Sequence, residues 1–466
     1  MSLLTQNTMA SRSLTTPLRK SQYICDSCLK CAPSFRNPRA PTSRAFSHAS
    51  SQNRETTARR PRSFERQHRL KAIQSGSGTF NRINASSRSY STEASTPQAV
   101  LSGIAPLPHR RLISLSGPDT TKFLQGLITN NVDSTRLSPF YSAFLDARGR
   151  VLWDVFVWVW PELVAEQGHW GCYIEVDATE VESLKKHLKK HKLRSKIVIK
   201  DVPTEGADGI RVWAAWGGAH EHVKQWSEIA GFEDPRAPGF FRYIANAERN
   251  SIAESLQPVD TQCYHVQRYL HGVPEGPSEI ARETALPMES NIDLNGGIDF
   301  KKGCYVGQEL TIRTKHTGVV RKRVLPVRFH AADSAVATSS PGHDSDVTST
   351  HFNPSFSPLP QHGTDIKALD DTGAIKKGRA AGKIVAAIGN VGLASCRLEN
   401  MTSMRVSAEG GTYKPGMQFG VETGGGVVRV EPVLYEWFVG RKKALWDREE
   451  RRKGAVVREL DEGGVE

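Results

Sequence analysis

Residues 301–309 read Lys-Lys-Gly-Cys-Tyr-Val-Gly-Gln-Glu, and they place one thiol, Cys304, between two glycines. Glycine opens backbone angles that other residues avoid, and it lets a ligand or a second chain approach closely. A cationic neighbour can lower the pKa of a thiol and make it a nucleophile or a metal ligand. A lone cysteine is often a small buried hydrophobe, but this composition suits neither a core strand nor a helix. The stretch therefore predicts a loop built around a functional thiol.

The pattern around Cys304 is long enough to carry a family resemblance. It consists of Lys302, Gly303, Cys304, Tyr305, Gly307, Gln308 and Glu309, and it continues through residues 310–318 and the basic run 321–323. It resembles the signature of the folate-binding proteins related to the glycine-cleavage T-protein, in the branch that assists iron–sulfur cluster assembly. The resemblance covers residues 108–327 and, more weakly, the C-terminal region. It implies an α+β fold of three domains around a central channel that holds a reduced folate, with a C-terminal β-barrel.

The basic charge of the chain is concentrated in its first part. The 466 residues carry a net charge of +13, and residues 1–96 hold sixteen Lys and Arg against four Asp and Glu. This segment is rich in Ser, Thr and Arg and lacks an apolar stretch, as mitochondrial transit peptides do. We expect residues 1–90 to be a transit peptide or a disordered basic leader, cleaved after Phe46 or Tyr90; a basic RNA-binding tail is the alternative. The rest of the chain is nearly neutral, which argues against nucleic-acid binding. No apolar run reaches the length of a membrane span.

The cysteines favour a reducing compartment. Three of the seven, Cys25, Cys28 and Cys31, lie in the leader with a spacing typical of iron–sulfur or zinc sites. We expect that segment to be removed, so we assign the spacing no role. The other four cysteines are widely scattered and do not suggest a disulfide scaffold. The mitochondrial matrix fits this distribution.

Hydrophobic periodicity and turn residues divide the rest of the chain into regions, with the fold beginning near Pro108. The predicted regions are a folate-binding-like α+β region at 91–205, a second α+β region with the Cys304 loop at 206–322, a β-barrel at 323–440 with a disordered insertion at 331–364, and a charged tail at 441–466. The predicted strands are 111–116, 139–145, 151–160, 170–176, 196–202, 210–216, 240–244, 323–329, 382–389, 391–398 and 427–439. The predicted helices are one that opens at residues 117–119, one at 179–191 and one at 259–270.

Two carboxylates are candidates for a folate pocket. Asp154 is the one charged side chain in the apolar strand 151–160, and a buried carboxylate needs a partner or a polar cavity. A pterin needs a carboxylate acceptor between apolar walls. The resemblance implies that role for Asp154 and for Glu289, although Glu289 could equally be a surface carboxylate. Arg313 and Arg321 could bind the folate carboxylates or an acidic partner, because arginine matches carboxylates bidentately.

The sequence departs from the aminomethyltransferases at Trp153, where those enzymes carry a second acid beside the equivalent of Asp154. Losing that acid weakens the case for acid–base chemistry on a folate amine, and gaining a thiol favours metal, cluster or redox chemistry. One cysteine cannot hold an iron–sulfur cluster, which normally takes four protein ligands. Cys304 is therefore a possible metal ligand only in a set shared with a partner or a small thiol. Lys302, Glu309 and His316 are the nearest candidates to assist it.

The resemblance implies a mitochondrial matrix assembly factor for 4Fe–4S proteins that binds tetrahydrofolate and handles a transient iron–sulfur cluster. The implied partners are A-type iron–sulfur scaffold proteins and recipient 4Fe–4S enzymes. The alternative is a folate-dependent one-carbon transferase, for aminomethyl or methyl groups, or a demethylase. Whether the chain is an enzyme stays open at this point.

Overall fold

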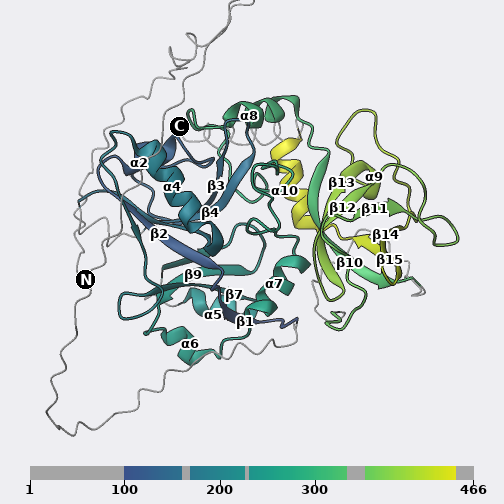
Figure 1. The fold of residues 1–466 in the computed structure, drawn as a ribbon, viewed down its shortest axis with the longest axis horizontal. Helices are drawn as coiled ribbons and strands as arrows, with labels where there is room; N and C mark the ends of the chain where they lie inside the picture. Colours follow the sequence, from purple (N-terminus) through teal and green to yellow (C-terminus); the bar gives the residue numbers. More distant parts are fainter. Residues whose placement is uncertain (1–98, 160–167, 226–229, 333–351, 448–466) are drawn as a thin grey trace, which may run out of the picture. The chain divides into compact units, whose positions relative to one another are not determined.

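The computed structural model describes residues 99–159, 168–225, 230–332 and 352–447, all within one unit of the chain, residues 89–466. The expected leader at 1–90 lies outside the described residues, and so does most of the expected charged tail. The described residues form two antiparallel sheets with helices around them and a closed β-barrel, so the α+β class is confirmed (Figure 1).

The first sheet has five antiparallel strands in the order β3-β4-β5-β2-β6. The strands are β2 (Arg110–Ser116), β3 (Phe140–Leu145), β4 (Val151–Val159), β5 (Gly171–Asp177) and β6 (Val198–Asp201). Helices α2 (Thr120–Gln125) and α4 (Val181–Lys192) accompany it, with a 3-10 turn at Ala178–Glu180 before α4. All nine residues of β4 are buried, because apolar clusters cover both faces of the sheet. That explains why β4 is an almost continuous apolar run rather than an alternating one.

The second sheet has four strands in the order β1-β7-β9-β8. They are β1 (Gly103–Pro106), β7 (Ile210–Trp216), β8 (Ala230–Glu233) and β9 (Phe240–Asn246), with α5 (Gly218–Lys224), α6 (Ser251–Ser255) and α7 (Thr261–Leu270). One apolar cluster draws residues from both sheets and from α7. The expected start of the fold near Pro108 is wrong: β1 precedes it and pairs with β7. The four residues of β1 are too short, and too rich in Gly and Pro, to show a strand period.

The C-terminal β-barrel is confirmed as a closed ring in the order β10-β13-β12-β11-β14-β15. Its strands are β10 (Lys322–Ala331), β11 (Asp365–Ala368), β12 (Gly382–Ile388), β13 (Val391–Arg397), β14 (Phe419–Thr423) and β15 (Gly426–Pro432), with the short helix α9 (Leu398–Met401) after β13. The predicted strand 427–439 is wrong in its second half. There the chain forms helix α10 (Glu436–Trp446), which buries Phe438 and Trp446 in the barrel cluster.

The expected disordered insertion at 331–364 is ordered where the structure describes it after the gap. Asn353 N–H donates to the Asn390 side-chain oxygen at 2.7 Å. Phe356 stacks on the buried Phe329 with ring centroids 6.3 Å apart. Residues 333–351 lie outside the described residues. A polar composition therefore hid two aromatic anchors, Phe352 and Phe356, which pack against core clusters. Backbone hydrogen bonds of Gly363 and Thr364 with Ile384 also hold this segment to the barrel.

Candidate functional site

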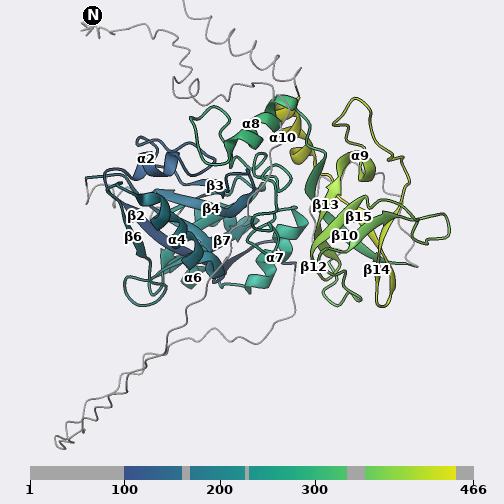
Figure 2. The same cartoon turned by 45° about the horizontal axis from the view of Figure 1, so that its top comes forward.

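The Cys304 loop ends in a helix that the sequence did not suggest. Helix α8 (Gln308–Thr317) begins directly after Gly307, so Gln308 and Glu309 form its first turn instead of prolonging the loop. The Gln308 side-chain oxygen accepts the Tyr305 N–H at 3.2 Å and closes the turn before the helix. Thr311 is the one buried residue of α8, so the helix lacks the apolar stripe by which helices are recognised in a sequence. Both views of the fold show α8 beside α10 (Figures 1 and 2), where Lys315 donates to the Leu445 carbonyl.

Lys302 anchors the loop. Its ammonium donates to three carbonyl oxygens, those of Gln125 at 2.9 Å, Ile128 at 2.6 Å and Asn130 at 2.8 Å. The Gln125 carbonyl belongs to the last turn of α2, where carbonyls have no partner within the helix, and the other two lie in the segment that follows it. The Lys302 ammonium also lies 4.9 Å from the centre of the Tyr305 ring. Burial lowers the pKa of Lys302 to about 8, with Asp299 acting in the opposite direction. All three of its donors are thus engaged away from the thiol.

Two glycines lock the loop against the turn between β3 and β4. Gly307 has φ +80° and Gly149 has φ +78°, a region that favours glycine. A Cβ on Gly307 would meet the Asp146 carbonyl oxygen and would lie 2.9 Å from the Leu145 Cβ. A Cβ on Gly149 would lie 3.0 Å from the Gly307 carbonyl oxygen. Gly303 differs, since a Cβ there would meet nothing within 4 Å.

Cys304 is exposed, whereas the other three cysteines that the structure describes are buried. Burial raises the pKa of the Cys396 thiol to about 12 and that of Cys172 further still, which keeps both protonated. A charged helical face follows the Cys304 thiol along the chain. Glu309, Arg313 and His316 are exposed at helical spacing along α8. Among the described residues, no group of three His, Cys, Asp or Glu side chains could hold a metal ion.

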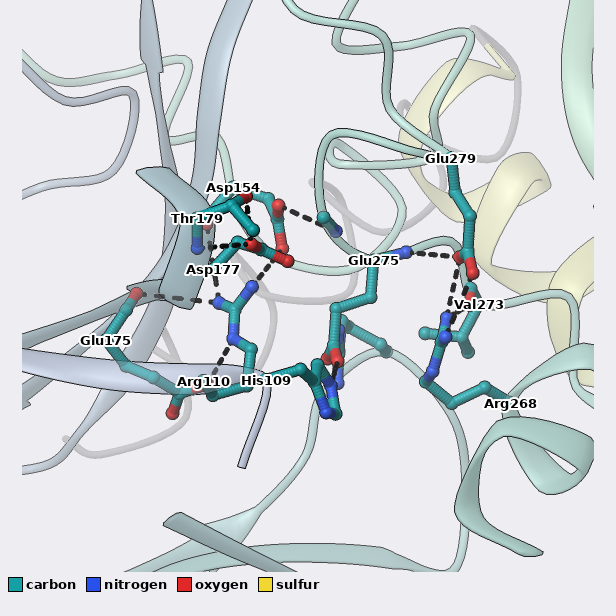
Figure 3. Close-up of polar contacts among 12 residues, drawn as sticks. His109, Arg110, Asp154, Glu175, Asp177, Thr179, Arg268, Val273, Glu275 and Glu279 are labelled. Atoms are coloured by element: carbon teal, nitrogen blue, oxygen red, sulfur yellow. Dashed lines mark hydrogen bonds and ion pairs between the residues drawn. The ribbon is translucent and has the colours of Figure 1, made fainter. Parts of the chain in front are cut away.

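Asp154 lies elsewhere, between the two sheets. Its Oδ1 accepts the Gly276 N–H at 3.0 Å, and its Oδ2 lies 3.5 Å from Arg110 Nη1 (Figure 3). Burial raises the pKa of Asp154, although the Arg110 charge acts in the opposite direction. The residue is 4% exposed, so both carboxylate oxygens face protein donors.

Asp154 belongs to a buried ion network that the sequence did not disclose. Glu175 accepts from Arg110 Nε at 2.8 Å, from Arg242 Nε at 3.0 Å and from Trp158 Nε1 at 3.0 Å. Burial alone would raise the pKa of Glu175, but Arg242 and Arg110 hold it below its ordinary value. The available signal was similar to the one that marked Asp154. Arg242 is the single charge in β9, and Glu175 lies between the apolar residues 174 and 176 of β5.

Glu275 is the second centre of this network. It accepts from Arg236 Nη1 at 2.7 Å and from the Tyr264 hydroxyl at 3.0 Å, and His109 Nε2 lies 2.8 Å from its other oxygen. Burial would raise its pKa, but Arg242 and Arg236 hold that pKa well below the ordinary value of a glutamate. Four arginines and five carboxylates are joined in this way; the arginines are Arg110, Arg236, Arg242 and Arg268, and the carboxylates are Asp154, Glu175, Asp234, Glu275 and Glu279.

Glu289 is more accessible than Asp154. Its carboxylate lies 3.9 Å from the Lys322 ammonium with a third of the side chain exposed, and its carbonyl oxygen accepts the Val324 N–H at 2.9 Å. Arg313 on α8 and Arg321 before β10 are exposed. No hydrogen bond or ion pair between described residues joins Glu289 to Asp154. Of the two carboxylates, Glu289 is therefore better able to accept hydrogen bonds from the N–H groups of a pterin. The oxygens of Asp154 already have hydrogen-bond partners within the protein.

Comparison with known proteins identifies the family of the chain. The chain is 64% identical over 391 residues to a Phaeosphaeria nodorum protein named iron–sulfur cluster assembly factor IBA57 homolog, mitochondrial. That match covers 84% of this chain and 94% of the relative. The chain belongs to the IBA57 family. A Coccidioides immitis protein of the same name is 42% identical over 372 residues, covering 73% of this chain and 82% of the relative. The expected branch is thereby confirmed, and IBA57 relatives carry the mitochondrial designation.

Two further comparisons concern the fold. Residues 321–438 match the family model described as CAF17, C-terminal beta-barrel domain. A glycine cleavage system aminomethyltransferase T from Bartonella henselae has a similar structure, with a TM-score of 0.50 at 13% identity. The structural match covers 74% of this chain and 88% of the transferase. The expected T-protein-like architecture is confirmed. None of the helices in the described part of the IBA57-family chain has the length and hydropathy to cross a membrane.

Proposed function

We propose that this chain is a mitochondrial matrix assembly factor for 4Fe–4S proteins and that Cys304 is its functional thiol. The observation that carries the proposal is the placement of Cys304. The thiol is exposed, whereas the loop that bears it is held by Lys302 and Gly307. The names of the IBA57 relatives support the same process. An anchored, accessible thiol can approach a cluster on another protein without a change of fold.

The iron–sulfur cluster is cargo in this proposal. One thiolate supplies one ligand, and the remaining ligands come from a partner protein or a small thiol. The partners we propose are A-type scaffold proteins, which would offer the cluster, and 4Fe–4S enzymes, which would receive it. The charged face of α8 with Glu309, Arg313 and His316 lies directly after the thiol in the chain, so it is the surface most suited to orient a partner.

Replacement of the chromosomal gene by a Cys304→Ala version tests the thiol. We expect normal protein abundance, reduced activity of mitochondrial 4Fe–4S enzymes and unchanged activity of a matrix enzyme without a cluster. Lys301→Met is the matched control, because Lys301 is exposed in the same loop. Among the described residues, the one hydrogen bond that it donates is from its backbone N–H to Asp299. Normal 4Fe–4S enzyme activities in the Cys304→Ala strain would show that the proposal is wrong.

We also propose tetrahydrofolate as a ligand, with the Glu289 carboxylate as acceptor for the pterin N–H groups and Arg321 or Arg313 for the folate carboxylates. A contribution from Asp154 stays a prediction. Equilibrium binding of tetrahydrofolate to the purified chain should weaken by tenfold or more in Glu289→Gln and less in Asp154→Asn, as loss of one charge-assisted hydrogen bond implies. An absence of saturable binding would refute the ligand. The transferase or demethylase alternative is not favoured, since Asp154 is closed off from a substrate.

A further inference from the structure

One cationic pocket has neither Cys304 nor Asp154 in its lining. It has a volume of about 260 Å³ and is lined by three residues around the start of β10, by the 405–407 loop after α9, and by the C-terminal end of α10. The three residues around the start of β10 are Gly318, Val320 and Arg323. Its charged and aromatic lining residues are Arg323, Arg405, Lys442, Lys443, Trp446 and Asp447. Four cationic side chains and one carboxylate thus line this pocket.

Arg323 is the buried member of this lining. Its two terminal nitrogens each lie 2.8 Å from an oxygen of Asp293, so this charge is paired. Its Nε is buried and has no hydrogen-bond partner among the described residues. The Arg323 side chain is 1% exposed, and a buried donor without an acceptor carries a desolvation penalty.

No ion pair between described residues joins Lys442 or Arg405 to a carboxylate. Lys442 Nζ donates to the Arg405 carbonyl oxygen at 3.1 Å. Burial lowers the pKa of Lys442 and Arg323 lowers it further, while Asp447 and Glu399 act in the opposite direction. Glu399 itself is engaged, since it accepts the backbone N–H groups at 406 and 407. In the described part of the chain, no ion pair involves the exposed Arg405 guanidinium.

Basic residues near the end of a helix have an ordinary explanation, because they complement the negative helix C-terminus. Lys443 in the last turn of α10 fits that explanation, and Lys315 donates a hydrogen bond to the Leu445 carbonyl oxygen. The explanation does not extend to Lys442, whose ammonium turns to the 405–407 loop, or to Arg405, which belongs to another element. The indole of Trp446 adds one aromatic wall, fixed by its 2.7 Å hydrogen bond to Asp293.

We propose that this pocket binds a small oxyanion with two or more charges, carried on phosphate or carboxylate groups. Arg405 and Lys442 supply positive charge that no ion pair between described residues takes up, and Lys443 and the buried Arg323 add to the cationic lining. The proposal goes beyond cluster assembly and folate binding, because it involves neither Cys304 nor Glu289.

Calorimetric titration of the full chain with pyrophosphate and with citrate, at one pH and one ionic strength, tests the pocket. The double variant Arg405→Gln/Lys442→Gln removes two lining charges. The matched control Lys189→Gln/Lys190→Gln removes two exposed charges from α4 and leaves the pocket intact. We expect saturable binding of at least one probe, weakened tenfold or more in the pocket variant and unchanged in the control. The tighter probe identifies phosphate or carboxylate as the preferred group.

Two outcomes would overturn the proposal. One is an absence of saturable binding by both probes, and the other is equal weakening in both double variants, which would show attraction to basic charge in general. Circular dichroism and thermal melts without ligand establish that each variant is folded. Should the double variant unfold, Arg405→Gln alone serves, because this side chain is exposed.

Discussion

Replacement of Lys302 by methionine tests whether this residue anchors the loop, as the structure indicates, rather than activating the thiol. Methionine keeps an unbranched apolar side chain and removes the ammonium. Hydrogen bonds from charged donors contribute about 1.5–3 kcal/mol each, and Lys302 makes three of them, to the carbonyls of Gln125, Ile128 and Asn130. Burial of the ammonium, which lowers its pKa to about 8, offsets part of that gain. We therefore expect a net loss of about 2–4 kcal/mol in the free energy of unfolding.

Urea unfolding followed by tryptophan fluorescence measures this loss, with Lys301→Met as the control. The two variants change charge and composition identically, but Lys301 is exposed. Its hydrogen bond to the Asp299 carboxylate comes from the backbone N–H and therefore does not depend on the side chain. The free energy of unfolding of the control should lie within about 0.5 kcal/mol of that of the unchanged chain. If Lys302→Met is as stable as Lys301→Met, the three carbonyl contacts do not hold the loop, and the anchoring role is refuted.

Three further outcomes follow from the contacts. Gly307→Ala should lower the free energy of unfolding by about 2–4 kcal/mol, because its φ is +80° and a Cβ would clash, whereas Gly303→Ala should change it by less than about 0.5 kcal/mol; equal urea midpoints would contradict this. Glu175→Gln should lower the free energy of unfolding by about 3–5 kcal/mol, because it breaks a buried ion pair. The control Glu182→Gln, at an exposed ion pair, should lower it by about 0.5 kcal/mol or less in the same measurement. Since the folded-state pKa values of Glu175 and Glu275 lie below their ordinary values, they stabilise the fold above about pH 4.5. That stability should fall as the pH drops further; a flat unfolding free energy from pH 6 to 3 would contradict it.

The elements that were predictable have signals in their own residues. The hairpin of β3 and β4 was marked by two apolar runs around Asp146–Gly149, and α4 by Leu184 and Leu188 four residues apart. Helix α10 was missed because residues 433–439 are mostly β-branched and aromatic, which favours a strand. In the structure the segment is helical, and the helix buries Phe438 and Trp446 in the cluster of the barrel. Tertiary packing overrode the local preference.

The candidate site was predictable only in part, for a related reason. Cys304 and its motif are contiguous, so they could be recognised without knowing the fold. The partners of Asp154 could not, because Arg110 lies 44 residues away and Gly276 lies 122 residues away. A lone charge in an apolar strand shows that a partner must exist, but it does not show which residue that partner is. The sequence therefore left two interpretations of Asp154, as a paired carboxylate or as one lining a polar cavity, and the structure was needed to choose between them.

The position of the Cys304 loop explains how its thiol can be both exposed and well placed. Tyr305 is buried in the apolar cluster shared by the two sheets, while the next residue, Val306, packs against the cluster on the other face of the first sheet. Two consecutive side chains thus enter two different cores, so the backbone beside Cys304 is fixed from both sides. Neighbouring Gly303 leaves open space. A partner that meets this edge would not have to order the loop, and avoiding that entropy loss favours association. The thiol is thus exposed on a backbone that its neighbours already hold in place.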